Sequence, residues 1–161
     1  MTASANSITV AACDLSDMSH RKAVADLINA YIMDEMGGGT PLTEDEQVRL
    51  TDGLGNHPSA IILLAAAGDG FVGLLVAFEN FSTFTARPMI NIHDVMVLPG
   101  YRGQGVGRRL LDAIVEEAAR RHASRITLEV RQDNVVARNL YKSLGFASPT
   151  PDMYYWRKYL E

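Results

Sequence analysis

The organisation of this chain follows from one stretch, Val95-Met96-Val97-Leu98-Pro99-Gly100-Tyr101-Arg102-Gly103-Gln104-Gly105-Val106-Gly107-Arg108-Arg109-Leu110-Leu111. An apolar strand is followed by a turn with three glycines at alternate positions, and the turn leads into a helix. Backbone N–H groups at a helix start can converge on an anion, and the helix dipole adds partial positive charge there. A plain helix cap needs one special residue rather than three glycines flanked by arginines. The stretch therefore predicts a phosphate-binding turn.

Spacing separates this turn from two familiar phosphate loops. A P-loop requires Lys and then Ser or Thr where Val106 and Gly107 stand. A dinucleotide-binding turn requires Gly or Ala where Arg108 stands. The pattern that remains is R-x-x-G-x-G, from Arg102 to Gly107.

A second pattern lies downstream, in Leu128-Glu129-Val130, Asn134, Ala137 and Leu140-Tyr141-Lys142-Ser143-Leu144-Gly145-Phe146. Together the two patterns resemble those of the GNAT family of N-acetyltransferases, whereas the N-terminal portion matches no motif. The resemblance implies acetyl-CoA as cosubstrate and a mixed α/β (α+β) fold. It also implies one domain over residues 1–161, with a central mixed, mostly antiparallel sheet that is splayed at the acetyl-CoA site and flanked by helices.

Composition is that of an ordinary globular protein. The chain has 161 residues, of which 47% are hydrophobic and 21% charged. The net charge of −4 gives no general affinity for nucleic acid. No apolar run approaches the roughly 18 residues of a membrane span, and residues 1–7 resemble a flexible tail rather than a signal peptide. The single cysteine suits a reducing cytoplasm. We expect a cytoplasmic protein with no metal, no nucleic-acid partner and no membrane partner, and a homodimer is left open.

Hydrophobic periodicity predicts the order βααβββαβαβ. The expected strands are 8–12, 59–67, 71–81, 89–98, 125–131 and 153–160, with a further short strand considered around Phe146. The expected helices are 19–36, 43–55, 104–122 and 134–144. Thr43 and Glu46 predict a capping box, Asp133 is expected to cap the last helix, and Gly145 suits the left-handed position after it.

The strand–helix–strand unit over 89–131 predicts a parallel, right-handed crossover. Ligands of such units bind beyond the carboxyl ends of the strands. Val97, residues 102–107 and Asn134 are therefore expected around one cleft. The segment between the first two helices is either a substrate loop or a plain connection.

The residues expected to hold acetyl-CoA come from both patterns. The resemblance implies backbone pairing of the pantetheine arm with 95–97, an oxyanion-binding N–H near Val95 or Met96, and a polar contact from Asn134. The alternative for Asn134 is a bond to its own helix backbone. The full set is Val95, Met96, Val97, Arg102, Gly103, Gln104, Gly105, Val106, Gly107, Arg108, Asn134 and Tyr141.

Tyr141 and His93 are the expected catalytic residues. Tyr141 lies two helical turns after Asn134, and its hydroxyl, with an ordinary pKa of about 10, can protonate a departing thiolate. In the family a tyrosine here is the usual general acid; the alternative is a core aromatic. His93 can serve as the general base that deprotonates the amine, or can simply bond to backbone, and Glu79 is its rival.

The sequence thus predicts an acetyl-CoA-dependent N-acetyltransferase that moves an acetyl group to a small-molecule primary amine by direct attack. The alternatives are a non-catalytic acyl-CoA-binding or regulatory module and a protein or peptide N-acetyltransferase. Asp94 and Glu79 are the residues expected to bind the substrate. Asp94 suggests a cationic acceptor, as do the acidic residues at the helix ends around 34–46. Asp94 can equally be structural, and residues 44–46 also suit a helix N-terminus.

Overall fold

The structure, a computed structural model, describes residues 7–160. It divides into two compact units, Met1–Glu129 and Val130–Glu161, which are described separately. The flexible tail expected at 1–7 lies outside the described residues, apart from Ser7. The single domain expected over 1–161 stays a prediction.

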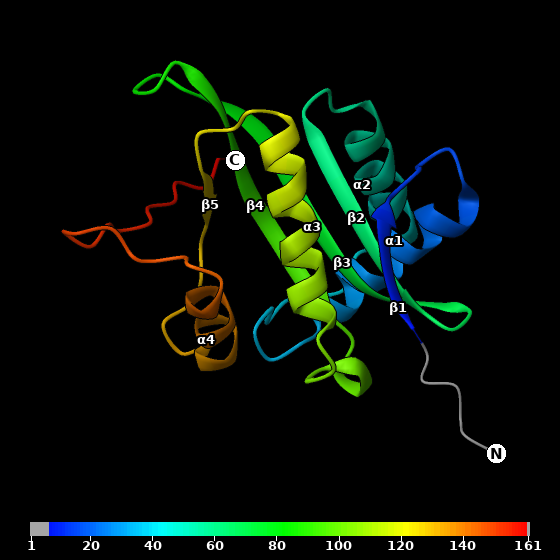
Figure 1. The fold of residues 1–161 in the computed structure, drawn as a ribbon. Coiled ribbons are helices and arrows are strands. Elements are labelled where there is room, and N and C mark those ends of the chain that lie inside the picture. Colours follow the sequence, from blue (N-terminus) through cyan, green and yellow to red (C-terminus); the bar gives the residue numbers. More distant parts are fainter. Residues whose placement is uncertain (1–6, 161) are drawn as a thin grey trace. The chain divides into compact units, whose positions relative to one another are not determined.

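The first unit is built on a five-stranded sheet in the order β1-β2-β3-β4-β5 (Figure 1). Its strands are β1 (Ile8–Ala12), β2 (Ala60–Ala67), β3 (Gly70–Ser82), β4 (Arg87–Val97) and β5 (Ile126–Leu128). All neighbours pair antiparallel except β4 and β5, which pair parallel. The helix α3 (Val106–Arg120) connects that parallel pair, as a crossover requires. The expected mixed, mostly antiparallel sheet is confirmed.

The two faces of the sheet carry different helices. In Figure 1, α3 lies in front of the sheet, and α1 (Met18–Ile32) and α2 (Glu44–Asn56) lie behind it. One core cluster packs Val24, Leu27 and Ile28 of α1 against β2, β3 and β4, with Met96 among its members. A Cβ on Gly73 of β3 would lie 2.9 Å from a Val106 methyl, so α3 is seated directly on that strand.

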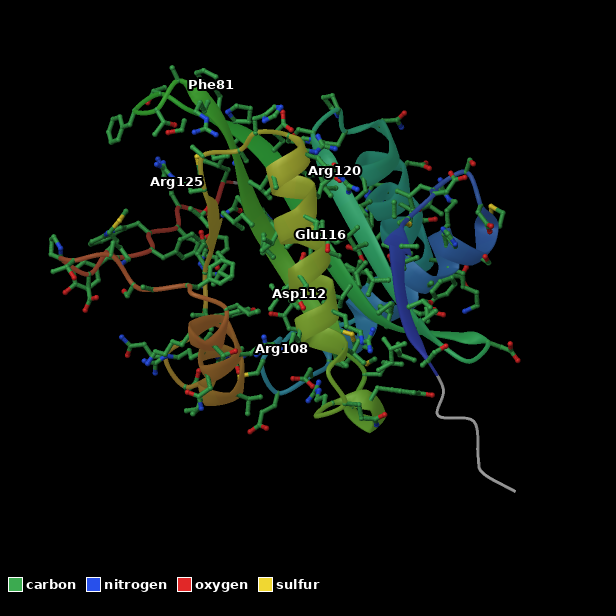
Figure 2. All side chains as sticks on the ribbon, viewed as in Figure 1. Phe81, Arg108, Asp112, Glu116, Arg120 and Arg125 are labelled. Carbon is green, nitrogen blue, oxygen red and sulfur yellow. The ribbon has the colours of Figure 1, made fainter. Side chains whose placement is uncertain are left out.

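The outward side of α3 is charged. Figure 2 shows Arg108, Asp112, Glu116 and Arg120 along it, each four residues after the last. The buried residues Leu110, Leu111 and Ile114 occupy the other side of the helix. This division is the amphipathic pattern from which the helix was predicted.

Several predicted boundaries need correction. The first helix ends at Ile32 rather than near residue 36, because residues 34–39 fold into a tight turn whose N–H groups bond back to Ile32 and Asp34. The helix expected from 104 begins at Val106, since Gly105 adopts φ 83°. The strand expected over 125–131 is limited to β5, and β4 begins at Arg87 rather than at residue 89. The Thr43–Glu46 capping box is confirmed.

The second unit contains α4 (Val135–Ser143). Its cap is Asn134, whose side-chain oxygen accepts the N–H of Ala137 at 3.1 Å, so the cap predicted at Asp133 is wrong. The Asp133 carboxylate pairs instead with Arg131 at 2.7 Å. Gly145 has φ 87°, as expected of a left-handed residue after a helix.

The final strand predicted over 153–160 is also wrong, and no strand forms around Phe146 in the part of the chain that the structure describes. Aromatic composition favours a pleated, half-buried surface but does not supply the neighbouring strand that a ladder requires. In the structure this stretch has no regular secondary structure, and the side chains of Tyr154 and Trp156 are exposed.

Candidate active site

The turn before α3 adopts a backbone that glycine alone accommodates well. Gly103 and Gly105 have φ values of 74° and 83°, in the left-handed region. A Cβ built on either residue would meet nothing within 4 Å. Backbone conformation, rather than crowding, therefore requires these glycines. The space beside them is open.

The start of α3 has backbone donors that the helix does not use. The first α-helical bond runs from the Arg109 N–H to the Gly105 carbonyl at 3.0 Å, so the N–H groups of Val106 and Gly107 have no acceptor within the helix. Gly105 occupies the N-cap position and has no side chain to accept from them. These N–H groups and the helix dipole suit an anion such as a pyrophosphate.

Two of the side chains that were expected to contact the cofactor form hydrogen bonds within the protein instead. The Arg102 guanidinium donates to the Val97 carbonyl at 3.0 Å and pairs with the Asp34 carboxylate at 2.6 Å. The Gln104 side-chain amide donates to the Gly100 carbonyl at 2.9 Å. The hydrogen bonds from Arg102 and from the Met36 N–H hold the pKa of Asp34 below its ordinary value.

The strand that leads into this turn has one unpaired edge. β5 pairs with β4 only from Ile90 to Ile92. Beyond Ile92, within residues 7–160, no strand pairs with β4 on that side, whereas β3 continues to pair with it as far as Val97. The edge of β4 that faces β5 is therefore unpaired next to the glycine turn. The backbone groups of 93–96 that point away from β3 can pair with another extended chain.

His93 is the extra residue of a β-bulge. Val76 of β3 faces Asp94 and Ala77 faces Ile92, which leaves His93 without a partner on β3. Its side chain is exposed, and its ring lies edge-on to Phe78 with 4.9 Å between centroids. Phe78 makes a similar contact, at 4.7 Å, with His57.

Asp94 lies beside His93 on the face that carries α1. Directly opposite residues of an antiparallel pair share a face, so Asp94 lies with Val76, a member of the α1 core cluster. Burial raises the pKa of Asp94, and the nearby His93 lowers it by a smaller amount. Among the described residues, no hydrogen bond or ion pair to its carboxylate is found. A partly buried carboxylate without a partner is typical of a functional site.

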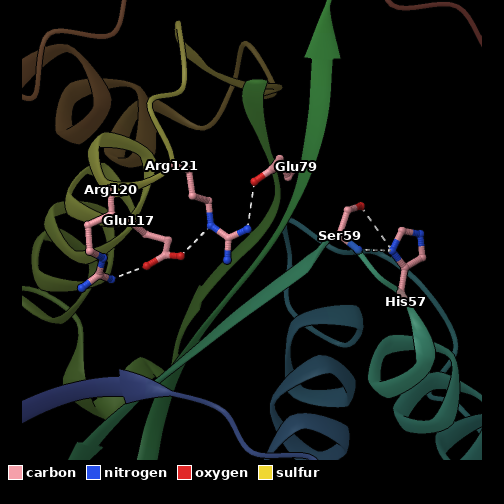
Figure 3. Close-up of polar contacts among 6 residues, drawn as sticks. All are labelled: His57, Ser59, Glu79, Glu117, Arg120 and Arg121. Carbon is pink, nitrogen blue, oxygen red and sulfur yellow. Dashed lines mark hydrogen bonds and ion pairs between the residues drawn. The ribbon is translucent and has the colours of Figure 1, made fainter. Parts of the chain in front are cut away.

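Glu79 lies on the other face of the sheet. It sits opposite Ile90, and its carboxylate pairs with Arg121 at 2.8 Å (Figure 3). Arg121 also pairs with Glu117 at 2.5 Å, which places this network at the C-terminal end of α3. The glycine turn is at the other end of that 15-residue helix, roughly 20 Å away along its axis.

Asn134 and Tyr141 belong to the second unit. Asn134 uses its side-chain oxygen to cap α4, which is the alternative considered for it, while its side-chain NH₂ group remains a further donor. The Tyr141 ring is tilted against Phe146, with centroids 5.9 Å apart. The cleft expected between these residues and 95–107 stays a prediction.

Sequence patterns did not reveal three features of this site. The bulge at His93 depends on the register with β3, the Asp34–Arg102 pair joins residues 68 apart, and the Phe78–His57 contact joins a strand to the end of α2. None of these has a local sequence signature. Within residues 7–160, no group of three or more His, Cys, Asp or Glu residues is placed to hold a metal, and no helix is long and apolar enough to cross a bilayer.

Comparison with known proteins identifies a family for this chain. The acetyltransferase (GNAT) family model matches residues 25–146. The chain belongs to this family. The matched range includes both sequence patterns, the one over 102–107 and the one over 128–146. The family resemblance expected from the sequence is confirmed.

Individual family members are similar over part of their length. The uncharacterized N-acetyltransferase YhfO of Bacillus subtilis is 32% identical over 102 residues, which cover 63% of this chain and 68% of that protein. The thialysine N-epsilon-acetyltransferase of Mus musculus is 33% identical over 108 residues, 62% of this chain and 63% of the mouse protein. A crystal structure of a probable acetyltransferase has the same fold, with a TM-score of 0.79 and 24% identity over 96% of this chain and 99% of that one. The family match and these relatives assign the chain to the acetyltransferases, the enzyme class expected from the sequence.

Proposed function

We propose that this chain transfers an acetyl group from acetyl-CoA to a primary amine by direct attack. The observation that carries the proposal is the uncapped, glycine-lined start of α3 beside the unpaired edge of β4. The first suits a pyrophosphate and the second suits the amide-containing pantetheine arm. GNAT membership makes acetyl-CoA the expected donor.

In this proposal the backbone does most of the donor binding. The pantetheine arm pairs with Val95 to Val97, and the N–H groups from Gly103 to Arg108 surround the pyrophosphate. An N–H at Val95 or Met96 stabilises the oxyanion that forms when the amine nitrogen attacks the thioester carbon. The side-chain NH₂ of Asn134 offers a further polar contact to the cofactor.

His93 is the preferred general base. It is exposed, is set apart from the ladder by the bulge, and lies on the strand with the unpaired edge. Glu79 is less suitable, since its carboxylate is held by Arg121 on the α3 face. His93 accepts the ammonium proton, directly or through water, so that the neutral amine can attack.

Tyr141 is the proposed general acid. When the tetrahedral intermediate collapses, the C–S bond breaks and the electron pair stays on sulfur. The Tyr141 hydroxyl then gives its proton to the thiolate, and the attacking nitrogen releases its extra proton to solvent as the amide forms. A binding or regulatory module would not need such an acid, so Tyr141→Phe separates an enzyme from that alternative. We expect kcat to fall by roughly 10²–10⁴-fold with CoA affinity largely retained.

The acceptor is proposed to be a small cationic amine. Asp94 is a partly buried carboxylate beside the proposed base, and a related mouse enzyme is named for acetylation of thialysine. Steady-state rates with a polyamine, a neutral arylamine and an N-terminal peptide, at low and high salt, distinguish the acceptor classes. A preference for the peptide would favour a protein N-acetyltransferase, and a salt-independent preference for the arylamine would exclude electrostatic recognition. A cytoplasmic location and a homodimer remain predictions from sequence.

The donor site is tested by calorimetric titration of acetyl-CoA into Gly105→Asp and Gly105→Asn. The two side chains are nearly equal in size, and Asn tolerates the left-handed region better than most residues, so their difference reports the added negative charge. We expect Gly105→Asp to bind much more weakly than Gly105→Asn, and both to bind more weakly than the wild type. Gly53→Asp, at an exposed glycine of α2 with open space around it, is the control. Unchanged affinity in a folded Gly105→Asp protein would remove the phosphate site.

A further inference from the structure

We propose that Asp34 and Arg102 are paired positioning residues that fix the phosphate loop (residues 102–107) to the α1–α2 connector (residues 33–43). The inference rests on the proposed function, because it concerns the same CoA site. It assigns Arg102, the first residue of R-x-x-G-x-G, to holding the loop rather than to contacting the phosphates.

Arg102 is bound on two sides by the protein. Its Nε donates to the Val97 carbonyl at 3.0 Å, and its Nη2 pairs with Asp34 Oδ2 at 2.6 Å. The Asp34 side chain is only 15% exposed, whereas that of Arg102 is 49% exposed. The guanidinium therefore links the end of β4, the phosphate loop that follows it and the connector after α1.

The connector presents Asp34 in a fixed position. Asp34 Oδ1 accepts the Met36 N–H at 3.0 Å, and its backbone carbonyl accepts the N–H groups of Gly37 and Gly38 at 2.9 and 3.0 Å. A Cβ on Gly37 would lie 2.0 Å from the Tyr31 carbonyl oxygen, so only glycine allows the turn to pack this closely on the end of α1. The carboxylate is thus oriented by its own turn before Arg102 reaches it.

The other end of the connector is also attached to α1. The Asn29 side-chain oxygen accepts the Leu42 N–H at 2.7 Å, and the Gln47 amide donates to the Leu42 carbonyl at 3.0 Å. The connector is therefore held by hydrogen bonds near both of its ends, at Asp34 and at Leu42. The connector is the segment considered as a substrate loop, so the pair couples the donor loop to the acceptor side.

The charges also favour this assignment. Asp34 neutralises Arg102, so the side chain contributes little net positive charge to an anion beyond the loop. An unpaired Asp34 carboxylate would instead repel a pyrophosphate. Arg102 suits the role because its planar fork can bond a carbonyl and a carboxylate at the same time, which a lysine ammonium does with less defined geometry.

The test is a double-mutant cycle on CoA affinity with Asp34→Asn, Arg102→Gln and the double variant, measured by calorimetry. We expect each single variant to weaken CoA binding roughly fivefold or more and the double variant to bind no more weakly than Arg102→Gln. Arg102→Lys should recover part of the loss. The KM for acetyl-CoA should rise while kcat stays within about twofold. If Arg102 contacts the phosphates directly, Arg102→Gln binds weakly whereas Asp34→Asn binds as well as, or better than, the wild type, which overturns the proposal.

Amide hydrogen exchange on the ligand-free protein tests the link without CoA. Faster exchange of the hydrogen-bonded amides of Gly37 to Gly39 and of Tyr101 and Arg109 in either single variant supports the coupling, and a change confined to the mutated segment overturns it. Asp26→Asn, which breaks an exposed Lys22–Asp26 pair on α1, is the matched control. If the wild-type chain does not bind CoA at all, the proposed function fails, but the exchange result still decides whether the two segments are linked.

Discussion

Where β3 pairs with β4, the carboxylates on the two faces of the sheet differ in whether they have ion-pair partners. On the α3 face, Glu79 pairs with Arg121, and Arg121 with Glu117. On the α1 face, Asp94 is partly buried with no partner for its carboxylate among the described residues, and the exposed His93 is held out of the ladder. A partly buried charge without a partner costs stability, whereas paired surface charges cost little. On this basis we propose that the α3 face is structural and that the α1 face carries the function.

Among the variants that test this comparison of the two faces, His93→Ala has the largest expected effect, which is on catalysis. Loss of a general base typically lowers the rate by about 10²-fold or more, and the acidic limb of the kcat/KM profile should disappear with it. The measurement is kcat/KM against pH where chemistry limits the rate. If Glu79→Gln removes that limb instead and His93→Ala does not, the functional assignment of the two faces is reversed.

Gly73→Ala probes packing on the α3 face. The added Cβ would lie 2.9 Å from Val106 and 3.2 Å from Leu110, so α3 must shift, at a cost of about 1–3 kcal/mol in the free energy of unfolding. Gly70→Ala is the control on the same strand, since its Cβ would meet nothing within 4 Å. Urea unfolding measures both variants. Equal stabilities would mean that α3 is not tightly seated on β3.

Asp94→Asn tests the cost of the charge on the α1 face. Burial raises the pKa of Asp94 above its ordinary value of 3.8, so between those two pKa values the folded protein binds more protons than the unfolded chain. The free energy of unfolding therefore falls as pH rises through that interval. We expect Asp94→Asn to be more stable than the wild type at pH 7, with the difference narrowing as pH falls towards 4. A less stable Asp94→Asn at pH 7 would show that the carboxylate has a stabilising partner.

The smallest effect is expected for Glu79→Gln. The side chains of Glu79 and Arg121 are 32% and 38% exposed, so solvent screens their pair and its loss should cost about 0.2–1 kcal/mol. Arg121→Gln removes more, because it also breaks the pair between Arg121 and Glu117. Thermal unfolding reports the stability, and kcat/KM should stay within about twofold of the wild type. A tenfold loss of kcat/KM would make the α3 face functional as well.

Local patterns predicted most of the fold. The capping box at Thr43, the amphipathic α3 and the parallel crossover each depend on residues close in sequence, and all three are confirmed. The prediction of a final strand over 153–160 was wrong, because a strand needs a neighbouring strand to pair with and its own residues do not specify one. The prediction that Asp133 caps α4 was wrong, because its carboxylate pairs with Arg131.

The candidate site divides in the same way. The glycine turn can be predicted from sequence, since positive φ values limit the residue type locally. The bulge at His93 and the link from Asp34 to Arg102 depend on which segments meet in space. Period-two alternation would put Ile90, Ile92, Asp94 and Met96 on one face. The bulge instead separates the first two, opposite Glu79 and Ala77, from the last two, opposite Val76 and Leu74.

Because of that bulge, the residue at position 93 can be gained or lost in evolution independently of the fold. Removing His93 altogether would bring Ile92 next to Asp94 and restore a regular ladder, with Ile90 and Met96 still on their present faces. A single codon inserted into an ordinary hairpin could therefore introduce a basic side chain at the sheet surface without repacking the hydrophobic interior. Loss of one codon could abolish it just as cleanly. Such a position can change in evolution while the scaffold that carries it stays the same.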